Sequence, residues 1–186
     1  MNLPSPFETL SSEITWSSPW YHIESSQILL PNGRQTTYHV VKKAGAAFVV
    51  PVTGAGEIVL IHNYRYTVDD WCWEVPAGNI EPGASPQETA IAELREEVGG
   101  TAEAWHDLGQ SYTMNGICDE MGHYFLATGV QLAEPEHEPV EVMQIHRKPI
   151  AEALEMLRDG SILDGQTLIA LYRAEPLLKQ MLDSMG

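Results

Sequence analysis

The chain has 186 residues, a formal net charge of −16 and a sequence pI of about 4.6. This excess of carboxylates repels nucleic acid and anionic membrane surfaces, so we expect neither as a partner. No apolar run approaches the roughly 20 residues of a membrane helix, and the N-terminus lacks the basic and apolar segments of a signal peptide. Cys72 and Cys118 are too few for a disulfide framework and lack zinc-knuckle spacing, so we interpret both as structural. A cytoplasmic protein is expected.

The N-terminal part of the chain predicts β-structure. Residues 1–18, rich in Ser, Thr, Pro and Glu, are interpreted as an arm. In residues 19–43, two β-prone runs flank the turn signal Pro31-Asn32-Gly33 and predict a hairpin. Further strands are expected at 44–52, 57–66 and 71–75.

A helix follows, and its ends are marked in the sequence. Ser85 suits the N-cap, Pro86 the first helical position and Glu88 the reciprocal capping-box position, while Gly99-Gly100 supplies a stop. Beyond it, strands are expected at 104–112, 122–130 and 139–147, and helices at 149–159 and 165–183. This order predicts an α+β or mixed α/β sandwich rather than a regular βαβ series.

The carboxylates at the end of this helix are the most informative feature. At about 100° per residue, Glu93, Glu96 and Glu97 fall within an arc of about 100°. Glu93 and Glu97 stand one turn apart, where like charges repel, and near the helix C-terminus, where the backbone dipole disfavours anions. A bound divalent cation would reverse both penalties, so the pattern indicates a metal site. The alternative is a solvated acidic face, whose repulsion Arg95 relieves in part.

The flanking residues complete a pattern of fixed spacing: Gly78, Glu93, Glu96, Glu97 and Gly99, preceded by Trp-Glu-Val-Pro-Ala at 73–77. In this pattern the chain resembles the Nudix hydrolases, whose box runs Gly-x5-Glu-x7-Arg-Glu-U-x-Glu-Glu-x-Gly-U, with U aliphatic. The likeness covers about residues 44–170. Three positions depart from the box, namely Ala84 in place of Glu, Ala92 in place of Arg and Gly100 in place of the aliphatic residue.

Other residues are similar to one branch of the family, that of nucleotide-sugar hydrolases typified by ADP-ribose pyrophosphatase. They are Tyr64-Arg65, Ser111-Tyr112, Asp119-Glu120 and the run at 123–127. The resemblance implies a Nudix-type α/β/α sandwich of mixed sheets over 44–186. It also implies that the hairpin at 19–43 is a dimerisation element, so that a homodimer is expected.

The activity that the resemblance implies is Mg²⁺-dependent hydrolysis of a nucleoside diphosphate sugar, with Mn²⁺ as a substitute ion. ADP-ribose, giving AMP and ribose 5-phosphate, is the favoured substrate. GDP-mannose, coenzyme A and dinucleoside polyphosphates remain alternatives, because the box contacts only the shared diphosphate. A catalytically weakened nucleotide-binding module is a further alternative, motivated by Ala84 and Ala92. Paired loss of two ion partners leaves a fold intact but loosens the remaining carboxylates.

The resemblance also implies roles for the acidic residues. Glu93 and Glu97 are expected as metal ligands, together with the backbone carbonyl of Ala77, and Glu96 as a further ligand or a base. In the loop after the strand at 122–130, Glu136 and Glu138 are expected as general base and supplementary ligand. A solvated acidic loop is the alternative there.

Three further residues are expected to bind substrate. Arg65 is interpreted as a phosphate clamp, because a guanidinium binds two phosphate oxygens at once. A surface salt bridge from Arg65 to Asp69 or Asp70 is the alternative. Glu74 is expected to position substrate, and Glu120 to approach the metal site across the sheet.

Overall fold

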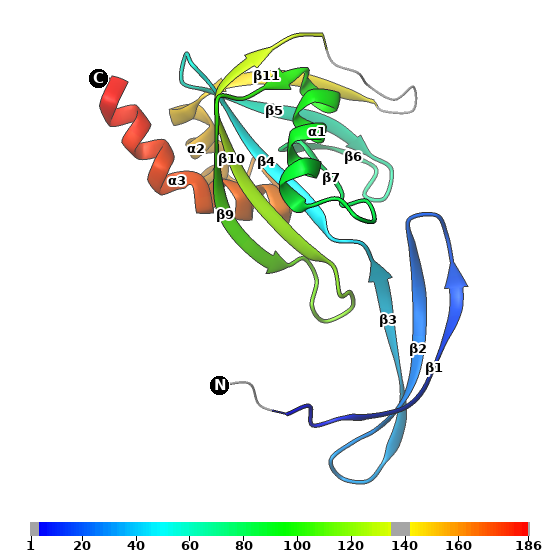
Figure 1. Cartoon of the computed structure of the whole chain (residues 1–186). Helices are drawn as coiled ribbons and strands as arrows, with labels where there is room; N and C mark the ends of the chain where they lie inside the picture. Colours follow the sequence, from blue (N-terminus) through cyan, green and yellow to red (C-terminus); the bar gives the residue numbers. More distant parts are fainter. Residues whose placement is uncertain (1–3, 135–141, 186) are drawn as a thin grey trace. The chain divides into compact units, whose positions relative to one another are not determined.

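The computed structural model describes residues 4–134 and 142–185, which divide into two compact units (Figure 1). The N-terminal unit consists of residues 4–45 and 112–121. The main unit consists of residues 46–111, 122–134 and 142–185. Among the helices described, none combines the length and apolarity needed to cross a membrane.

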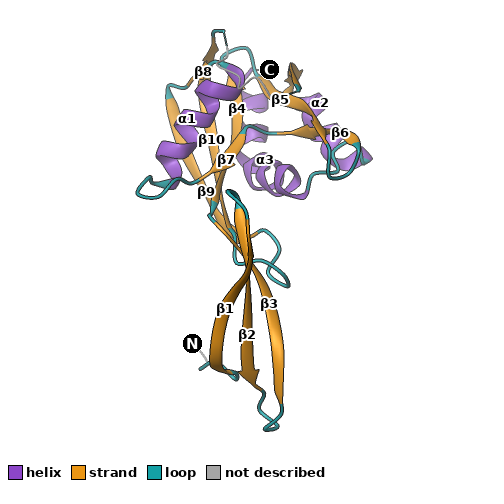
Figure 2. Ribbon diagram, turned by 90° about the vertical axis from the view of Figure 1, so that its right-hand side faces the viewer, coloured by secondary structure: helices purple, strands orange, loops and turns teal. Residues whose placement is uncertain are grey.

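The N-terminal unit is built on an antiparallel sheet of three strands in the order β1-β2-β3 (Figure 2). Its strands are β1 (Glu8–Ser17), β2 (Tyr21–Leu29) and β3 (Gln35–Lys43). Between β2 and β3 the chain turns at Gly33, whose φ of 81° lies in the left-handed region that glycine tolerates. The hairpin predicted from the turn signal is therefore present.

Strand β1 lies in the segment interpreted as an arm, so residues 8–17 form a strand that was not among the expected elements. Hydroxyl groups link β1 to β2, with Ser12 Oγ 2.8 Å from Ser26 Oγ and Thr15 Oγ1 3.1 Å from Ser25 Oγ. The Ser and Thr residues whose abundance suggested an arm thus form cross-strand hydrogen bonds here.

The main unit contains a mixed sheet with the strand order β11-β5-β4-β10-β8, to which β6, β7 and β9 are paired at the sides. The central pair, β4 and β10, runs parallel. The strands are β4 (Ala46–Thr53), β5 (Glu57–Arg65), β6 (Asp70–Glu74), β7 (Ala77–Asn79), β8 (Gly100–Thr101), β9 (Ala104–Tyr112), β10 (Met121–Leu132) and β11 (Met143–Pro149). The helices are α1 (Pro86–Val98), α2 (Ile150–Asp159) and α3 (Gly165–Met185).

Helices cover both faces of this sheet, as alternate residues of β4 show. Ala47 and Val49 pack into one buried cluster with residues of α1, whereas Val50 and Val52 pack into another with residues of α2 and α3. Figure 2 shows α1 and the α2–α3 pair on opposite sides of the strands. The result is the expected three-layer α/β/α arrangement, and it explains why β4 is apolar at consecutive positions.

Helix α1 begins and ends where the sequence indicates. Ser85 is its N-cap and forms both bonds of the capping box with Glu88. Gly99, with φ of 65°, ends the helix in the left-handed conformation. The short strands β7 and β8 were not predicted, because two or three residues are too few to show an alternation of apolar and polar side chains.

Candidate active site

Strand β7 and the last two turns of α1 bring the box residues together. The backbone N–H of Ala77 donates a hydrogen bond to Glu97 Oε2 at 2.8 Å. A Cβ at Gly78 would lie only 1.7 Å from Glu93 Oε1, so the carboxylate of Glu93 occupies the space beside this glycine. The carboxylates expected to share a face of the helix therefore both lie against β7.

The third box carboxylate is engaged elsewhere. Glu96 accepts a hydrogen bond from Arg95 Nη2 at 3.0 Å, and nearly half of its side chain is exposed. Its expected part as ligand or base stays a prediction. Ala84 and Ala92, which replace the box Glu and Arg, are both partly buried.

Arg65 pairs with a residue that the sequence did not suggest as its partner. Its Nε lies 2.7 Å from Glu74 Oε1 and its Nη2 lies 2.5 Å from Glu74 Oε2. Asn63 Nδ2 also donates to Glu74 Oε2, at 3.3 Å. The alternative of a salt bridge to Asp69 or Asp70 is thus replaced by a bidentate pair with Glu74, although Asp70 is the residue directly opposite Arg65 in the register of β5 and β6.

The pair with Glu74 also fixes the charge state of the arginine. Hydrogen bonding to Glu74 raises the pKa of Arg65, and the nearby charge of Glu97 raises it further. Arg65 therefore remains a cation beside the box carboxylates. Glu74, whose side chain is buried, accepts both hydrogen bonds of the guanidinium.

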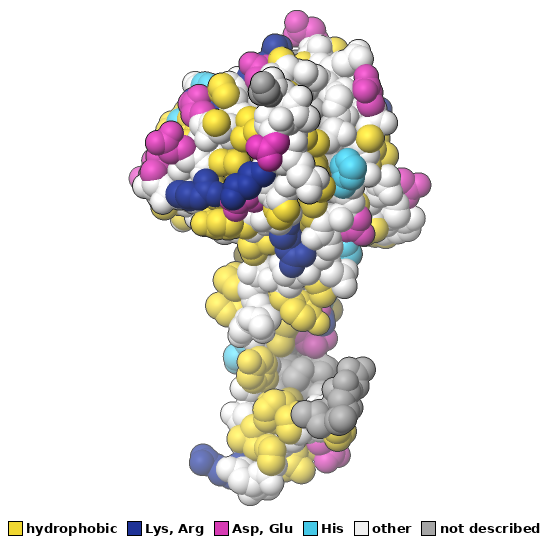
Figure 3. Space-filling model, turned by 90° about the vertical axis from the view of Figure 1, so that its left-hand side faces the viewer, with side chains coloured by type: hydrophobic (Ala, Val, Ile, Leu, Met, Phe, Trp, Pro, Cys, Tyr) yellow, Lys and Arg dark blue, Asp and Glu magenta, His cyan; other side chains and the backbone are white. Residues whose placement is uncertain are grey.

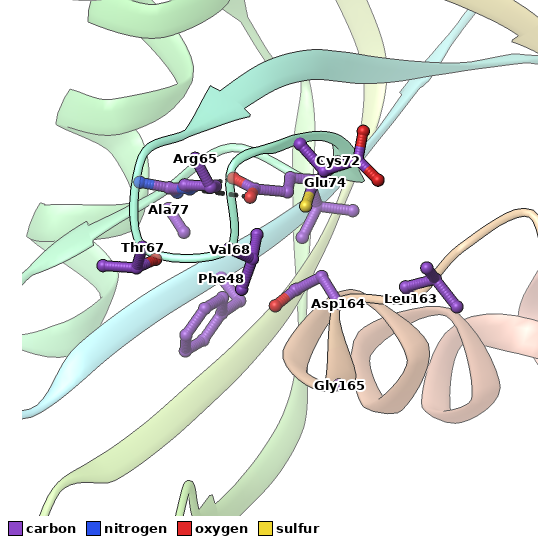
Figure 4. A pocket seen from close by; sticks show the side chains of 12 residues that line it. Phe48, Arg65, Thr67, Val68, Cys72, Glu74, Ala77, Leu163, Asp164 and Gly165 are labelled. Atoms are coloured by element: carbon purple, nitrogen blue, oxygen red, sulfur yellow. Dashed lines mark hydrogen bonds and ion pairs between the residues drawn. The ribbon is translucent and has the colours of Figure 1, made fainter.

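A pocket of about 530 Å³ opens beside these residues (Figure 4). Arg65, Glu74 and Ala77 line one part of it, and Leu163 and Asp164, which precede α3, line another. The remaining lining residues are Phe48, Thr67, Val68, Asp70, Cys72, Val75 and Gly165.

Two hydrogen bonds connect this pocket wall to α3. Asp164 Oδ2 accepts from the backbone N–H of Thr167 at 2.7 Å and so caps the first turn of the helix. The hydroxyl of Thr167, which is fully buried, accepts from the backbone N–H of Val75 at 3.0 Å. Asp164 is not among the site residues expected from the sequence, although an aspartate directly before a predicted helix is a recognisable N-cap signal.

The other expected site residues are Glu120, Glu136 and Glu138. Glu120 belongs to the N-terminal unit, where Lys43 forms an ion pair with it and Thr113 Oγ1 donates to it at 2.7 Å. Its expected contact with substrate stays a prediction. Glu136 and Glu138 lie outside the described residues.

The oxygen donors on β7 and α1 suit a small hard cation. Within 4–134 and 142–185, no three His, Cys, Asp or Glu side chains are gathered as a complete metal site. Mg²⁺, however, is usually held by one or two carboxylates and completed by water and substrate phosphates. Glu93, Glu97 and the carbonyl of Ala77 provide such a partial set, so the residues present fit this ion.

Comparison with known proteins identifies the class. Residues 42–166 match the NUDIX domain, and the chain therefore belongs to the Nudix hydrolase family. The departures at Ala84, Ala92 and Gly100 do not remove it from the family, and the prediction of a Nudix enzyme is confirmed.

Individual relatives with named activities resemble most of the chain. The chain is 32% identical to the ADP-ribose pyrophosphatase of Bacillus subtilis (strain 168), over 88% of this chain and 90% of that protein. It is 36% identical to the ADP-ribose pyrophosphatase of Mycobacterium tuberculosis, over 86% of this chain and 78% of that protein. A solved structure described as an ADP compounds hydrolase superposes with a TM-score of 0.83 over 97% of this chain and 98% of that one, at 22% identity. The protein is thus a Nudix pyrophosphohydrolase, of a family that typically depends on divalent metal ions.

Proposed function

We propose that the protein hydrolyses the diphosphate bond of a nucleoside diphosphate sugar, with ADP-ribose as the favoured substrate. Water adds to one phosphorus, the bond from that phosphorus to the bridging oxygen breaks, and the other phosphate leaves with this oxygen. From ADP-ribose the products are AMP and ribose 5-phosphate. The observation that carries the proposal is that the carboxylates of Glu93 and Glu97, on α1, both lie against β7 beside the pocket that Arg65 lines.

Three groups of this chain are proposed to hold the metal, namely Glu93, Glu97 and the carbonyl of Ala77. Mg²⁺, or Mn²⁺ in its place, supplies charge stabilisation at the phosphate oxygens and a lower pKa for bound water. The N–H of Ala77 keeps Glu97 in one orientation, and the backbone of Gly78 leaves room for Glu93. Orientation of this kind sets metal affinity and rate.

Arg65 is proposed to bind a phosphate oxygen of the diphosphate. Its two bonds to Glu74 use Nε and Nη2, and Nη1 offers further N–H donors. Glu74 is then a positioning residue, because it fixes the plane of the guanidinium. Glu136 or Glu138 is proposed as the base that takes the proton of the attacking water, with Glu96 as the alternative, and Glu120 as a further substrate-binding residue.

The relatives' names rank the candidate substrates. Two relatives above 30% identity are ADP-ribose pyrophosphatases, whereas a GDP-mannose pyrophosphatase of Yersinia enterocolitica is 25% identical, over 90% of this chain. These identities support ADP-ribose over GDP-mannose as the proposed substrate.

A steady-state assay with Mg²⁺ tests the proposal. We expect ADP-ribose to give AMP and ribose 5-phosphate in equal amounts, and excess EDTA to abolish turnover until Mg²⁺ or Mn²⁺ is restored. Turnover of GDP-mannose without turnover of ADP-ribose would reassign the substrate. Turnover that survives complete metal removal would contradict the metal-dependent mechanism.

We further propose that the protein is a homodimer assembled through the N-terminal unit. Large apolar side chains of its sheet and connecting turn are exposed, among them Leu10, Ile14, Trp16 and Trp20. Hydrophobic side chains are visible at the surface in Figure 3. Exposed apolar groups on an edge strand favour association. A cytoplasmic location is proposed as well, supported by the free thiols of Cys72 and Cys118.

A further inference from the structure

The pocket beside the box is negatively charged. Among the described residues that line it are three carboxylates, Asp70, Glu74 and Asp164, and one guanidinium, that of Arg65. Because Glu74 binds Arg65 in a bidentate pair, the charges of these two side chains balance each other. The described lining therefore carries two more carboxylates, Asp70 and Asp164, than its single guanidinium can balance.

The first turn of α3 does not reverse this charge. A helix N-terminus by itself attracts anions, because its first N–H groups have no partner within the helix. Here Asp164 already accepts from the N–H of Thr167 through Oδ2 and supplies the negative charge that the helix end favours. An incoming anion would meet the negative charge of the Asp164 carboxylate, which already accepts from one of these N–H groups.

The remaining lining suits a sugar ring. Figure 4 shows the carboxylate of Asp164 turned toward Phe48, with Val68 nearby. Asp164 Oδ1 is a second acceptor for hydroxyl groups, while Phe48 and Val68 offer apolar surface to the C–H face of a ring. Hydroxyl donors matched to carboxylate acceptors form strong charge-assisted hydrogen bonds.

We propose that this pocket receives the sugar of a nucleoside diphosphate sugar, and that Asp164 selects neutral, hydroxylated groups against anionic ones. The inference rests on the proposed hydrolysis of such substrates. It goes further because it assigns the specificity for the sugar to Asp164, a residue outside the Nudix box. A substrate whose second group carries its own phosphate or carboxylate would be repelled at Asp164.

The test compares two substrates, ADP-ribose and ADP-ribose 1″-phosphate, which differ by one charged phosphate group on the terminal ribose. For the wild-type protein with Mg²⁺ we expect kcat/KM to favour ADP-ribose by about tenfold or more, because unit charges a few ångströms apart in a partly solvated pocket repel on this scale. The preference should shrink as ionic strength rises, since salt screens the repulsion.

Asp164→Asn removes the charge and retains a residue that caps helices as well as aspartate does. We expect this variant to lower the preference for ADP-ribose about tenfold, mainly by improving kcat/KM for the phosphorylated substrate. The matched control is Asp183→Asn, an exposed residue of the same helix whose substitution changes the net charge equally and should leave the preference unchanged.

The outcomes separate the two proposals. Hydrolysis of neither substrate by the wild-type protein would overturn the proposed function and the inference with it. Hydrolysis of both substrates with equal kcat/KM at low salt would overturn the inference alone. An unchanged preference in a folded Asp164→Asn variant would also overturn it, and the salt dependence of the wild-type preference decides the matter if that variant does not fold.

Discussion

The carboxylate of Glu93 occupies the space where any residue other than glycine at position 78 would place its Cβ. The clash involves the flexible end of a glutamate, not the backbone, so the fold can relax by moving that side chain. Gly78 does not need a left-handed conformation. Gly78 therefore matters because it has no side chain and leaves space for the carboxylate of Glu93.

We predict that Gly78→Ala lowers kcat by on the order of 100-fold, because displacement of one ligand disturbs the proposed metal site. The melting temperature should fall by only a few degrees. Gly54→Ala is the matched control, since nothing lies within 4 Å of a Cβ placed there. A Gly78→Ala variant with full activity would show that the position of Glu93 does not matter for turnover.

Glu97 offers a substitution that separates charge from shape. In Glu97→Gln the side-chain amide oxygen can still accept from the N–H of Ala77, so the local structure is retained. We predict that kcat falls by on the order of 100-fold or more and that Mn²⁺ binding weakens, measured by steady-state kinetics and by electron paramagnetic resonance.

Glu155→Gln, an exposed change on α2, supplies the control of equal charge for Glu97→Gln. Its activity and Mn²⁺ affinity should match those of the wild type. Unchanged turnover in Glu97→Gln itself would place the catalytic metal elsewhere.

At the scale of elements, α1 is held at its start by a capping box and carries the proposed ligands at its end. We predict that Ser85→Ala destabilises the protein by about 1 kcal/mol, the usual cost of a lost N-cap. For a chain of this length the melting temperature should drop by about 2–4 °C. Differential scanning calorimetry measures both quantities.

The capping contribution should also depend on pH. Hydrogen bonds from the backbone and hydroxyl of Ser85 lower the pKa of Glu88 below its ordinary value of 4.5. A folded-state pKa below the unfolded value stabilises the protein above about pH 4.5, and this contribution is lost as the pH falls through the folded value. The difference in melting temperature between the wild type and Ser85→Ala should therefore become smaller at acidic pH. A difference that became larger would contradict a stabilising capping box formed by Ser85 and Glu88.

The helices and strands that could be predicted from the sequence are those marked by residues close together in the chain. The ends of α1 follow from Ser85, Glu88 and Gly99, since capping is settled within one helical turn. Strand β1 could not be read in the same way, because its Ser and Thr side chains find their partners only when β2 lies alongside.

At the scale of the whole molecule, the exposed apolar residues of the N-terminal unit predict self-association. We predict that the wild-type chain elutes as a dimer in size-exclusion chromatography with light scattering. Ile14→Glu, which places a charge at an exposed apolar position of β1, should raise the dimer dissociation constant by about tenfold or more.

Ile91→Glu makes the same change at an exposed isoleucine of α1, in the main unit, and should leave the dimer intact. A wild-type monomer at micromolar concentration would exclude the dimer. Equal effects of the two substitutions would exclude the N-terminal unit as the interface.

The sequence by itself determined the family, the bounds of α1 and the shared face of Glu93 and Glu97. Each of these depends on residue spacing, and a helix converts spacing into position by fixed geometry. Only the tertiary structure decided that Arg65 binds Glu74, that Glu97 meets the N–H of Ala77 and that Asp164 lines the same pocket. These residues come into contact because strand pairing and helix packing bring distant segments of the chain together. Such contacts cannot be predicted from a local sequence pattern.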